Sequence, residues 1–157
     1  MKYNDVRDKI KTGDLIAFSH GNIGGRIIQF FTQSHYTHVG VAYCIADRVM
    51  IFESVIPHTR LYPLSKLGDF YWIGLNGHFN IVAEEFAFSR LGERYSIIEC
   101  IRGWLNICKN ENAWWQCSEY AKQIYRANGY KLSRKDTPAE LINEMLNTGA
   151  ESIFVEV

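Results

Sequence analysis

The sequence lacks the features that would place it in several classes of protein. Its 17 lysines and arginines equal its 17 aspartates and glutamates, so no net charge favours binding to nucleic acid or to an anionic membrane. No apolar run approaches the roughly 20 residues of a membrane span, and the polar segment 1–11 lacks the apolar centre of a signal peptide. We therefore expect a cytoplasmic protein with no integral membrane segment and no nucleic-acid partner, although export without a signal, for example by cell lysis, stays open.

Cysteine spacings typical of metal or redox motifs are also missing. The cysteines are Cys44, Cys100, Cys108 and Cys117, and no C-x-x-C pair occurs, which excludes a zinc knuckle or a thioredoxin motif. A chain of 157 residues can bury roughly 70% of its unfolded surface, so it needs no disulfide to fold and free thiols are expected. With only 3 prolines and no repeat or linker, the sequence predicts a single domain over residues 1–157.

Hydrophobic periodicity divides the chain into a first half of strands and a second half dominated by helices. Runs of β-forming residues predict strands at 15–18, 39–45, 49–54 and 70–75, with a loop at 21–25 and a short apolar helix at 27–31. Helical patterns occupy 82–91, 97–107, the segment from Cys117 to Gly129, and the segment behind the capping box 137–140, before a last strand at 153–157. This order predicts an α+β fold with an antiparallel sheet packed against helices.

Cys117 is the candidate nucleophile. It lies at the predicted start of a helix and on its apolar face. The partial positive charge and unpaired N–H groups of a helix N-terminus stabilise both a thiolate and an oxyanion. The alternative is a buried structural cysteine, the role that we assign to Cys44, Cys100 and Cys108.

A thiol nucleophile needs a base, and His38 is well placed because it stands at the entry to a strand, which is a rigid support. If the hairpin turns at Ala46-Asp47, residue 38 pairs near residue 55. Glu53 then lies one diagonal step away on the same face, where it could fix the tautomer of His38. The plainer alternatives are a partly exposed histidine and a surface carboxylate, and a register slip of one residue would separate the two.

A metal site is not favoured by the spacing His35-x-x-His38. Residues three apart in a strand face opposite sides, and no acidic ligand lies at helical spacing. The glycine-rich segment 21–26 lacks the G-K-[ST] ending of a phosphate loop. We therefore expect no metal and no cofactor.

Short motifs follow one another in an informative order: G-D-L-I at 13–16, a histidine segment at 34–41, an acid segment at 51–54, L-G-x-x-Y at 91–95, aromatic-x-C-S-E at 115–119 and T-P at 137–138. Together they resemble the permuted papain-like amidases, which are YiiX-like relatives of the NlpC-type cell-wall peptidases. The match covers most of the chain, with the histidine and acid before the cysteine, whereas ordinary papain-like enzymes have the cysteine first. The resemblance implies a circularly permuted papain-like fold.

The same resemblance implies a cysteine peptidase or amidase that cleaves a peptide-like amide bond, for example in a cell-wall peptide. Cys117 matches the nucleophile, His38 the base and Glu53 the acid that orients the histidine. A lipid-directed acyl-transfer or thioesterase-type role, as in the lecithin–retinol acyltransferase relatives, stays open, as does a non-catalytic binding module. The oligomeric state is not predicted.

Three further residues are candidates for binding the oxyanion or the substrate. Tyr95 matches a tyrosine that can assist the oxyanion hole, with a core aromatic as an equal alternative. Gln116 precedes the nucleophile and could donate to an oxyanion, although a solvent-facing amide is the plainer interpretation. Trp115 could line an acyl or peptide pocket, with packing against the sheet as the alternative.

Overall fold

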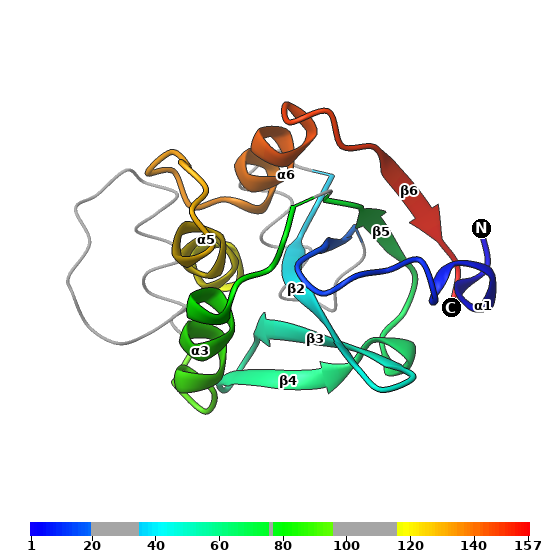
Figure 1. Ribbon diagram of the computed structural model, residues 1–157, viewed down its shortest axis with the longest axis horizontal. Coiled ribbons are helices and arrows are strands. Elements are labelled where there is room, and N and C mark those ends of the chain that lie inside the picture. Colours follow the sequence, from blue (N-terminus) through cyan, green and yellow to red (C-terminus); the bar gives the residue numbers. More distant parts are fainter. Residues whose placement is uncertain (20–34, 76, 96–115) are drawn as a thin grey trace.

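The computed structural model describes residues 1–19, 35–75, 77–95 and 116–157. Their strands form one six-stranded antiparallel sheet in the order β4-β3-β2-β1-β5-β6 (Figure 1). The strands are β1 (Leu15–Phe18), β2 (His38–Ile45), β3 (Arg48–Ser54), β4 (Thr59–Pro63), β5 (Phe70–Ile73) and β6 (Ser152–Val155). The helices are α1 (Tyr3–Val6), α3 (Ile81–Ser89), α5 (Cys117–Ala127) and α6 (Pro138–Leu146), with a 3-10 turn η1 (Leu64–Lys66). The predicted α+β class with an antiparallel sheet is confirmed.

The β2–β3 hairpin has the register that the sequence predicts. It turns at Ala46-Asp47, and its pairs include Val41 opposite Phe52 and Ile45 opposite Arg48. Continuing this register places residue 38 opposite residue 55 and Gly40 opposite Glu53. His38 and Glu53 therefore point to the same face of the sheet, because residues two apart in a strand share a face.

The sheet has an apolar core on each face. Side chains from β1 alternate between the two cores, with Leu15 and Ala17 in one and Ile16 and Phe18 in the other, and all are buried. Because both faces of β1 are buried, its sequence is a continuous apolar run. The first core lies against α3, α5 and α6, whereas α1 and η1 contribute to the second. Figure 1 shows α3 and α5 at one end of the molecule and α1 with both chain ends at the other.

Helix α5 is anchored to its surroundings by two buried tyrosines. The hydroxyl of Tyr125 donates to the carbonyl oxygen of Gly13 at 2.9 Å, and that of Tyr120 donates to the carbonyl oxygen of Ala87 at 2.6 Å. Both rings lie on the apolar face that the sequence predicts. These bonds fix the position of α5 relative to the start of β1 and to α3, and so they set where its N-terminal residue lies.

The predicted boundaries differ from the structure in several places. The short helix α1 and strand β4 were not predicted, β5 ends at Ile73 rather than at 75, and β6 ends at Val155. Thr137 is confirmed as the N-cap of α6, since its Oγ1 accepts from the N–H of Glu140 at 3.2 Å, which is one of the two bonds of the predicted capping box. The predictions for 21–25, 27–31 and 97–107 lie outside the described residues.

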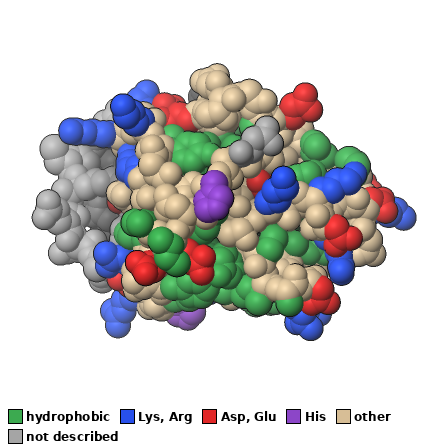
Figure 2. Space-filling model, viewed as in Figure 1, with side chains coloured by type: hydrophobic (Ala, Val, Ile, Leu, Met, Phe, Trp, Pro, Cys, Tyr) green, Lys and Arg blue, Asp and Glu red, His purple; other side chains and the backbone are tan. Residues whose placement is uncertain are grey.

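The surface carries no broad patch of one charge on the face seen in Figure 2, where acidic and basic side chains are interspersed. Among the described helices, none has the length and apolar character needed to cross a membrane.

Candidate active site

His38 and Glu53 meet at one end of the sheet. Nε2 of His38 lies 2.7 Å from Oε2 of Glu53. The Glu53 side chain is only 1% exposed and that of His38 is 21% exposed. Glu53 is therefore not a surface carboxylate, and the plainer interpretation of this residue is wrong.

Cys117 is the first residue of α5 and is buried. Its thiol is hydrogen-bonded to the side chain of His38, and the backbone N–H groups of Val39 and Ser118 donate to its sulfur. Because Nε2 of His38 faces Glu53, Nδ1 is the ring nitrogen left to meet the thiol. The structure thus brings Cys117, His38 and Glu53 into one chain of hydrogen bonds.

The thiol and the imidazole stabilise each other's charged forms. Burial raises the pKa of Cys117, but the hydrogen bond and the positive charge of His38, together with the N–H groups of Val39 and Ser118, lower the pKa below its ordinary value. Burial likewise lowers the pKa of His38, but the hydrogen bonds to Cys117 and Glu53, together with their charges, raise it to about 10. The arrangement favours a thiolate–imidazolium pair near neutral pH.

Glu53 has a second partner that sequence reasoning missed. Burial alone would raise its pKa, but hydrogen bonds and charges from His38 and Arg60 lower it. Nε of Arg60 donates to Oε1 of Glu53 at 2.7 Å, and a terminal guanidinium nitrogen lies 2.7 Å from the same oxygen. Arg60 lies directly opposite Glu53 in the β3–β4 ladder, so only a prediction of β4 could have found it.

Gln116 lies at the N-cap of α5, immediately before Cys117. It is 3% exposed, so the solvent-facing interpretation is wrong. Its Nε2 is buried and has no hydrogen-bond partner in the structure as described. A buried amide donor without a partner is uncommon in folded proteins and calls for an explanation.

The two remaining candidates for binding the oxyanion or the substrate are Tyr95 and Trp115. Tyr95 is partly exposed, and its N–H donates to the carbonyl oxygen of Pro57 at 2.9 Å, in the connection between β3 and β4. Trp115 lies outside the described residues.

His35 belongs to a different cluster from His38. Its Nε2 lies 3.0 Å from the hydroxyl of Tyr71, and its ring packs edge-on against Tyr36 and Tyr71. Across the described ranges, no group of three or more His, Cys, Asp or Glu residues could hold a metal ion.

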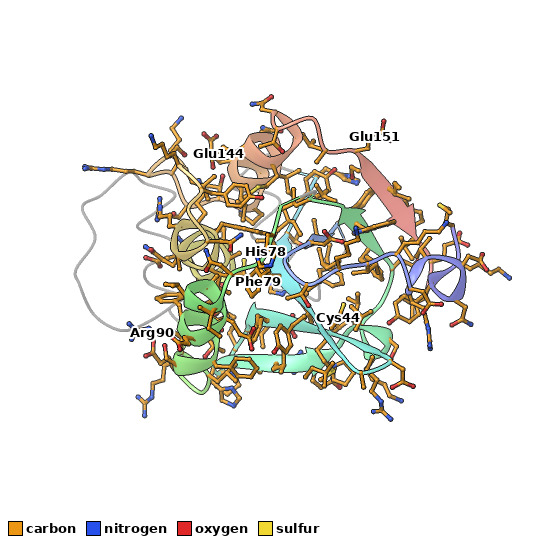
Figure 3. The ribbon with its side chains drawn as sticks, viewed as in Figure 1. Cys44, His78, Phe79, Arg90, Glu144 and Glu151 are labelled. Atoms are coloured by element: carbon orange, nitrogen blue, oxygen red, sulfur yellow. The ribbon has the colours of Figure 1, made fainter. Side chains whose placement is uncertain are left out.

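Cys44 is a second described thiol with which Cys117 can be compared. It lies in β2 toward the hairpin, away from α5 (Figure 3), and donates to the carbonyl oxygen of Ile10 at 3.3 Å. Burial raises its pKa, which is the opposite of the direction found for Cys117. The two thiols therefore differ in their electrostatic surroundings as well as in position.

The fold and the site together define an α+β protein in which a cysteine at a helix N-terminus meets a strand histidine backed by a buried carboxylate. A known structure with a similar fold is the crystal structure of the metalloprotein YiiX from Escherichia coli O157:H7. It aligns with a TM-score of 0.62 and 20% identity, over 79% of this chain and 69% of that chain. Likeness at this identity shows the fold, and it agrees at that level with the resemblance drawn from the motifs. Neither a family model nor a curated protein matches the sequence.

Proposed function

We propose that the protein is a cysteine hydrolase that cleaves an amide bond through a thioacyl intermediate, on a single circularly permuted papain-like domain. The observation that supports this most strongly is that one histidine is joined both to a helix-terminal thiol and to a buried carboxylate. A purely structural cysteine needs neither a charged partner nor two N–H donors at its sulfur. The substrate class implied by the motifs is a peptide-like amide, such as a cell-wall peptide.

The proposed reaction begins with attack of the Cys117 thiolate on the substrate carbonyl carbon, which forms a C–S bond. N–H groups at the start of α5 and Nε2 of Gln116 donate to the oxyanion. His38 gives its proton to the amine as the C–N bond breaks. His38 then takes a proton from water, whose oxygen attacks the thioester. The carboxylic acid leaves, and Cys117 departs as thiolate beside the protonated His38.

The buried amide of Gln116 adds independent support for an oxyanion site. Leaving a buried donor without a partner destabilises a fold by about 1–3 kcal/mol. A substrate oxyanion would satisfy this donor at the moment when its charge develops. Tyr95 is a second proposed donor and Trp115 a proposed pocket residue, both on the strength of the motifs.

Thiol labelling tests the proposal without knowledge of the substrate. Iodoacetamide is applied at neutral pH and the labelled cysteines are mapped by mass spectrometry. Cys117 should react faster than Cys44, because only the former has a lowered pKa. The preference should disappear in His38→Ala, whereas the rate at Cys44 should stay unchanged. Slow labelling of both thiols at similar rates would instead indicate a non-catalytic module.

The substrate class is tested by trapping the intermediate. The protein is mixed with a library of peptides and lipid esters, quenched in acid, and the mass added to Cys117 is measured. A peptidyl adduct, absent from Cys117→Ser, supports the amide hydrolase. A fatty acyl adduct would replace it with the lipid-directed alternative.

A further inference from the structure

We propose that Arg60 is a positioning residue of this site, whose guanidinium holds the Glu53 carboxylate in the orientation in which its other oxygen meets His38. Its expected effect on reactivity rests on the proposed function of Cys117. The expected effect of Arg60 on the geometry of His38 does not depend on that proposed function.

The two oxygens of the Glu53 carboxylate have different partners. Oε1 receives both guanidinium contacts from Arg60, each at 2.7 Å, and Oε2 lies 2.7 Å from Nε2 of His38. Rotation of the carboxylate would therefore disturb both sets of contacts at once. Because β3 and β4 place residues 53 and 60 directly opposite each other, the backbone itself sets this alignment.

Charge gives Arg60 a role that His38 cannot fill. The described groups that act on the ionisation of Glu53 are His38 from β2 and Arg60 from β4, with Cys117 of α5 beyond the imidazole. His38 loses and regains its proton during the proposed reaction, but an arginine stays charged throughout. Arg60 is thus the lasting positive charge beside a carboxylate that is 1% exposed, and it keeps that carboxylate ionised while the imidazole is neutral.

The shape of the guanidinium also matters. The guanidinium carbon lies 4.1 Å from the centre of the Tyr62 ring, so the group has an aromatic ring beside it while its N–H groups donate to Glu53. A lysine would reproduce the charge but not the paired contacts or the stacking. Arg60→Lys and Arg60→Met therefore separate the effect of charge from that of geometry.

The test measures the rate of Cys117 alkylation by iodoacetamide against pH. In Arg60→Met we expect a drop of about tenfold near neutral pH, the low end of what the loss of one hydrogen bond to a charged group gives. The acid limb of the profile, where the rate rises with pH, should also move to higher pH. Without Arg60 the pKa of Glu53 rises, and a protonated Glu53 no longer supports the imidazolium that lowers the pKa of Cys117. Arg60→Lys should keep the acid limb near its wild-type position but with a reduced rate. The control is Arg48→Met, at the opposite end of β3, which should behave as wild type.

A folded Arg60→Met protein with the wild-type rate and the wild-type acid limb would overturn the proposal. If methionine at position 60 prevents folding, the Arg60→Lys variant provides the test instead. A wild-type alkylation rate in Arg60→Lys would show that the paired guanidinium contacts do not position Glu53.

A second measurement separates this proposal from the proposed function. In Cys117→Ala protein, the proton on Nε2 of His38 that donates to Glu53 should give a sharp downfield NMR signal. Adding Arg60→Met should broaden or abolish that signal, whereas Arg48→Met should leave it unchanged. An unchanged signal in the Arg60 variant would overturn the positioning role whatever Cys117 does. An unreactive Cys117 with a signal that depends on Arg60 would overturn only the proposed hydrolase.

Discussion

The backbone N–H of Val39 donates to the sulfur of Cys117, so the strand that carries His38 also contacts the thiol directly. Val39 is fixed in the middle of the sheet by its pairing with Ala17 of β1. The second N–H donor, from Ser118, belongs to α5. The thiol therefore lies at the junction of sheet and helix, and its charge depends on both layers keeping their places.

The alkylation rate of Cys117 should follow an unusual pH profile. We expect it to rise at a pH below that of an ordinary thiol, because His38 lowers the pKa of Cys117, and to change again near pH 10, where His38 loses its proton. Cys44 in the same sample should react only at higher pH, since burial raises its pKa. Coincident profiles for the two thiols would contradict the ion pair.

Acid stability should report on the ionisation of Glu53. Its pKa is lowered in the folded protein by His38 and Arg60, although burial opposes them. The stability that it contributes is therefore fully present above its ordinary pKa of 4.5 and is lost as the pH falls through the lower folded value. Urea unfolding of wild type and Glu53→Gln should show a difference that is widest near pH 6 and narrows in acid. A constant difference across this range would indicate that the charge of Glu53 contributes nothing.

A methyl group at Gly40 should destabilise the strand that carries His38. A Cβ there would lie 2.6 Å from two atoms of the Ile51 side chain and 2.6 Å from the carbonyl oxygen of Phe52. The side chain can move, but the carbonyl belongs to the sheet, so we expect Gly40→Ala to lower the free energy of unfolding by about 1–3 kcal/mol. Gly68→Ala is the control, because nothing lies within 4 Å of the Cβ position there. Equal stability of the two variants in urea would show that the sheet yields at this point.

The meeting of His38 with Glu53 could be predicted because it is local. The position of the turn at Ala46-Asp47 fixes which residues of β2 and β3 lie opposite each other. Because side chains alternate between the two faces of a strand, this register also fixes which of them share a face. The contact between His38 and Cys117 has no such basis, since it depends on how α5 packs against the sheet. For that contact the resemblance of the motifs supplied what residue spacing could not.

Arg60 and the burial of Gln116 were missed for different reasons. The segment that forms β4 contains a charged residue and ends in Pro63, so it has no clear strand pattern; it becomes a strand through its ladder with β3. The exposure of Gln116 depends on tertiary packing around the start of α5, which no local pattern encodes.

The buried Lys122 should stabilise the segment that follows α5. The Lys122 side chain is 0% exposed. Its Nζ lies 2.6 Å from a carboxylate oxygen of Glu144 and donates to Ser133 Oγ at 3.1 Å. Removing one member of a buried ion pair typically destabilises by 3–5 kcal/mol, but Glu144 is partly solvated, so we expect about 2 kcal/mol for Lys122→Met. The exposed Lys131→Met is the control, and thermal unfolding measures both. Equal melting temperatures of the two variants would mean that the free energy lost by burying the Lys122 ammonium group equals the free energy gained from its partners.

Gln116 should affect acyl transfer but not alkylation. Acylation of Cys117 by p-nitrophenyl acetate passes through an oxyanion, whereas displacement of iodide from iodoacetamide does not. If Nε2 of Gln116 donates to that oxyanion, Gln116→Ala should slow the p-nitrophenol burst by about a hundredfold, which is what the loss of one such donor gives, and should leave the alkylation rate unchanged. Gln123→Ala, on the same helix, should alter neither reaction. Equal slowing of both reactions in the Gln116 variant would mean that the buried amide supports the thiolate or the start of α5, and the oxyanion site would then have to be built without Gln116, from backbone N–H groups and Tyr95.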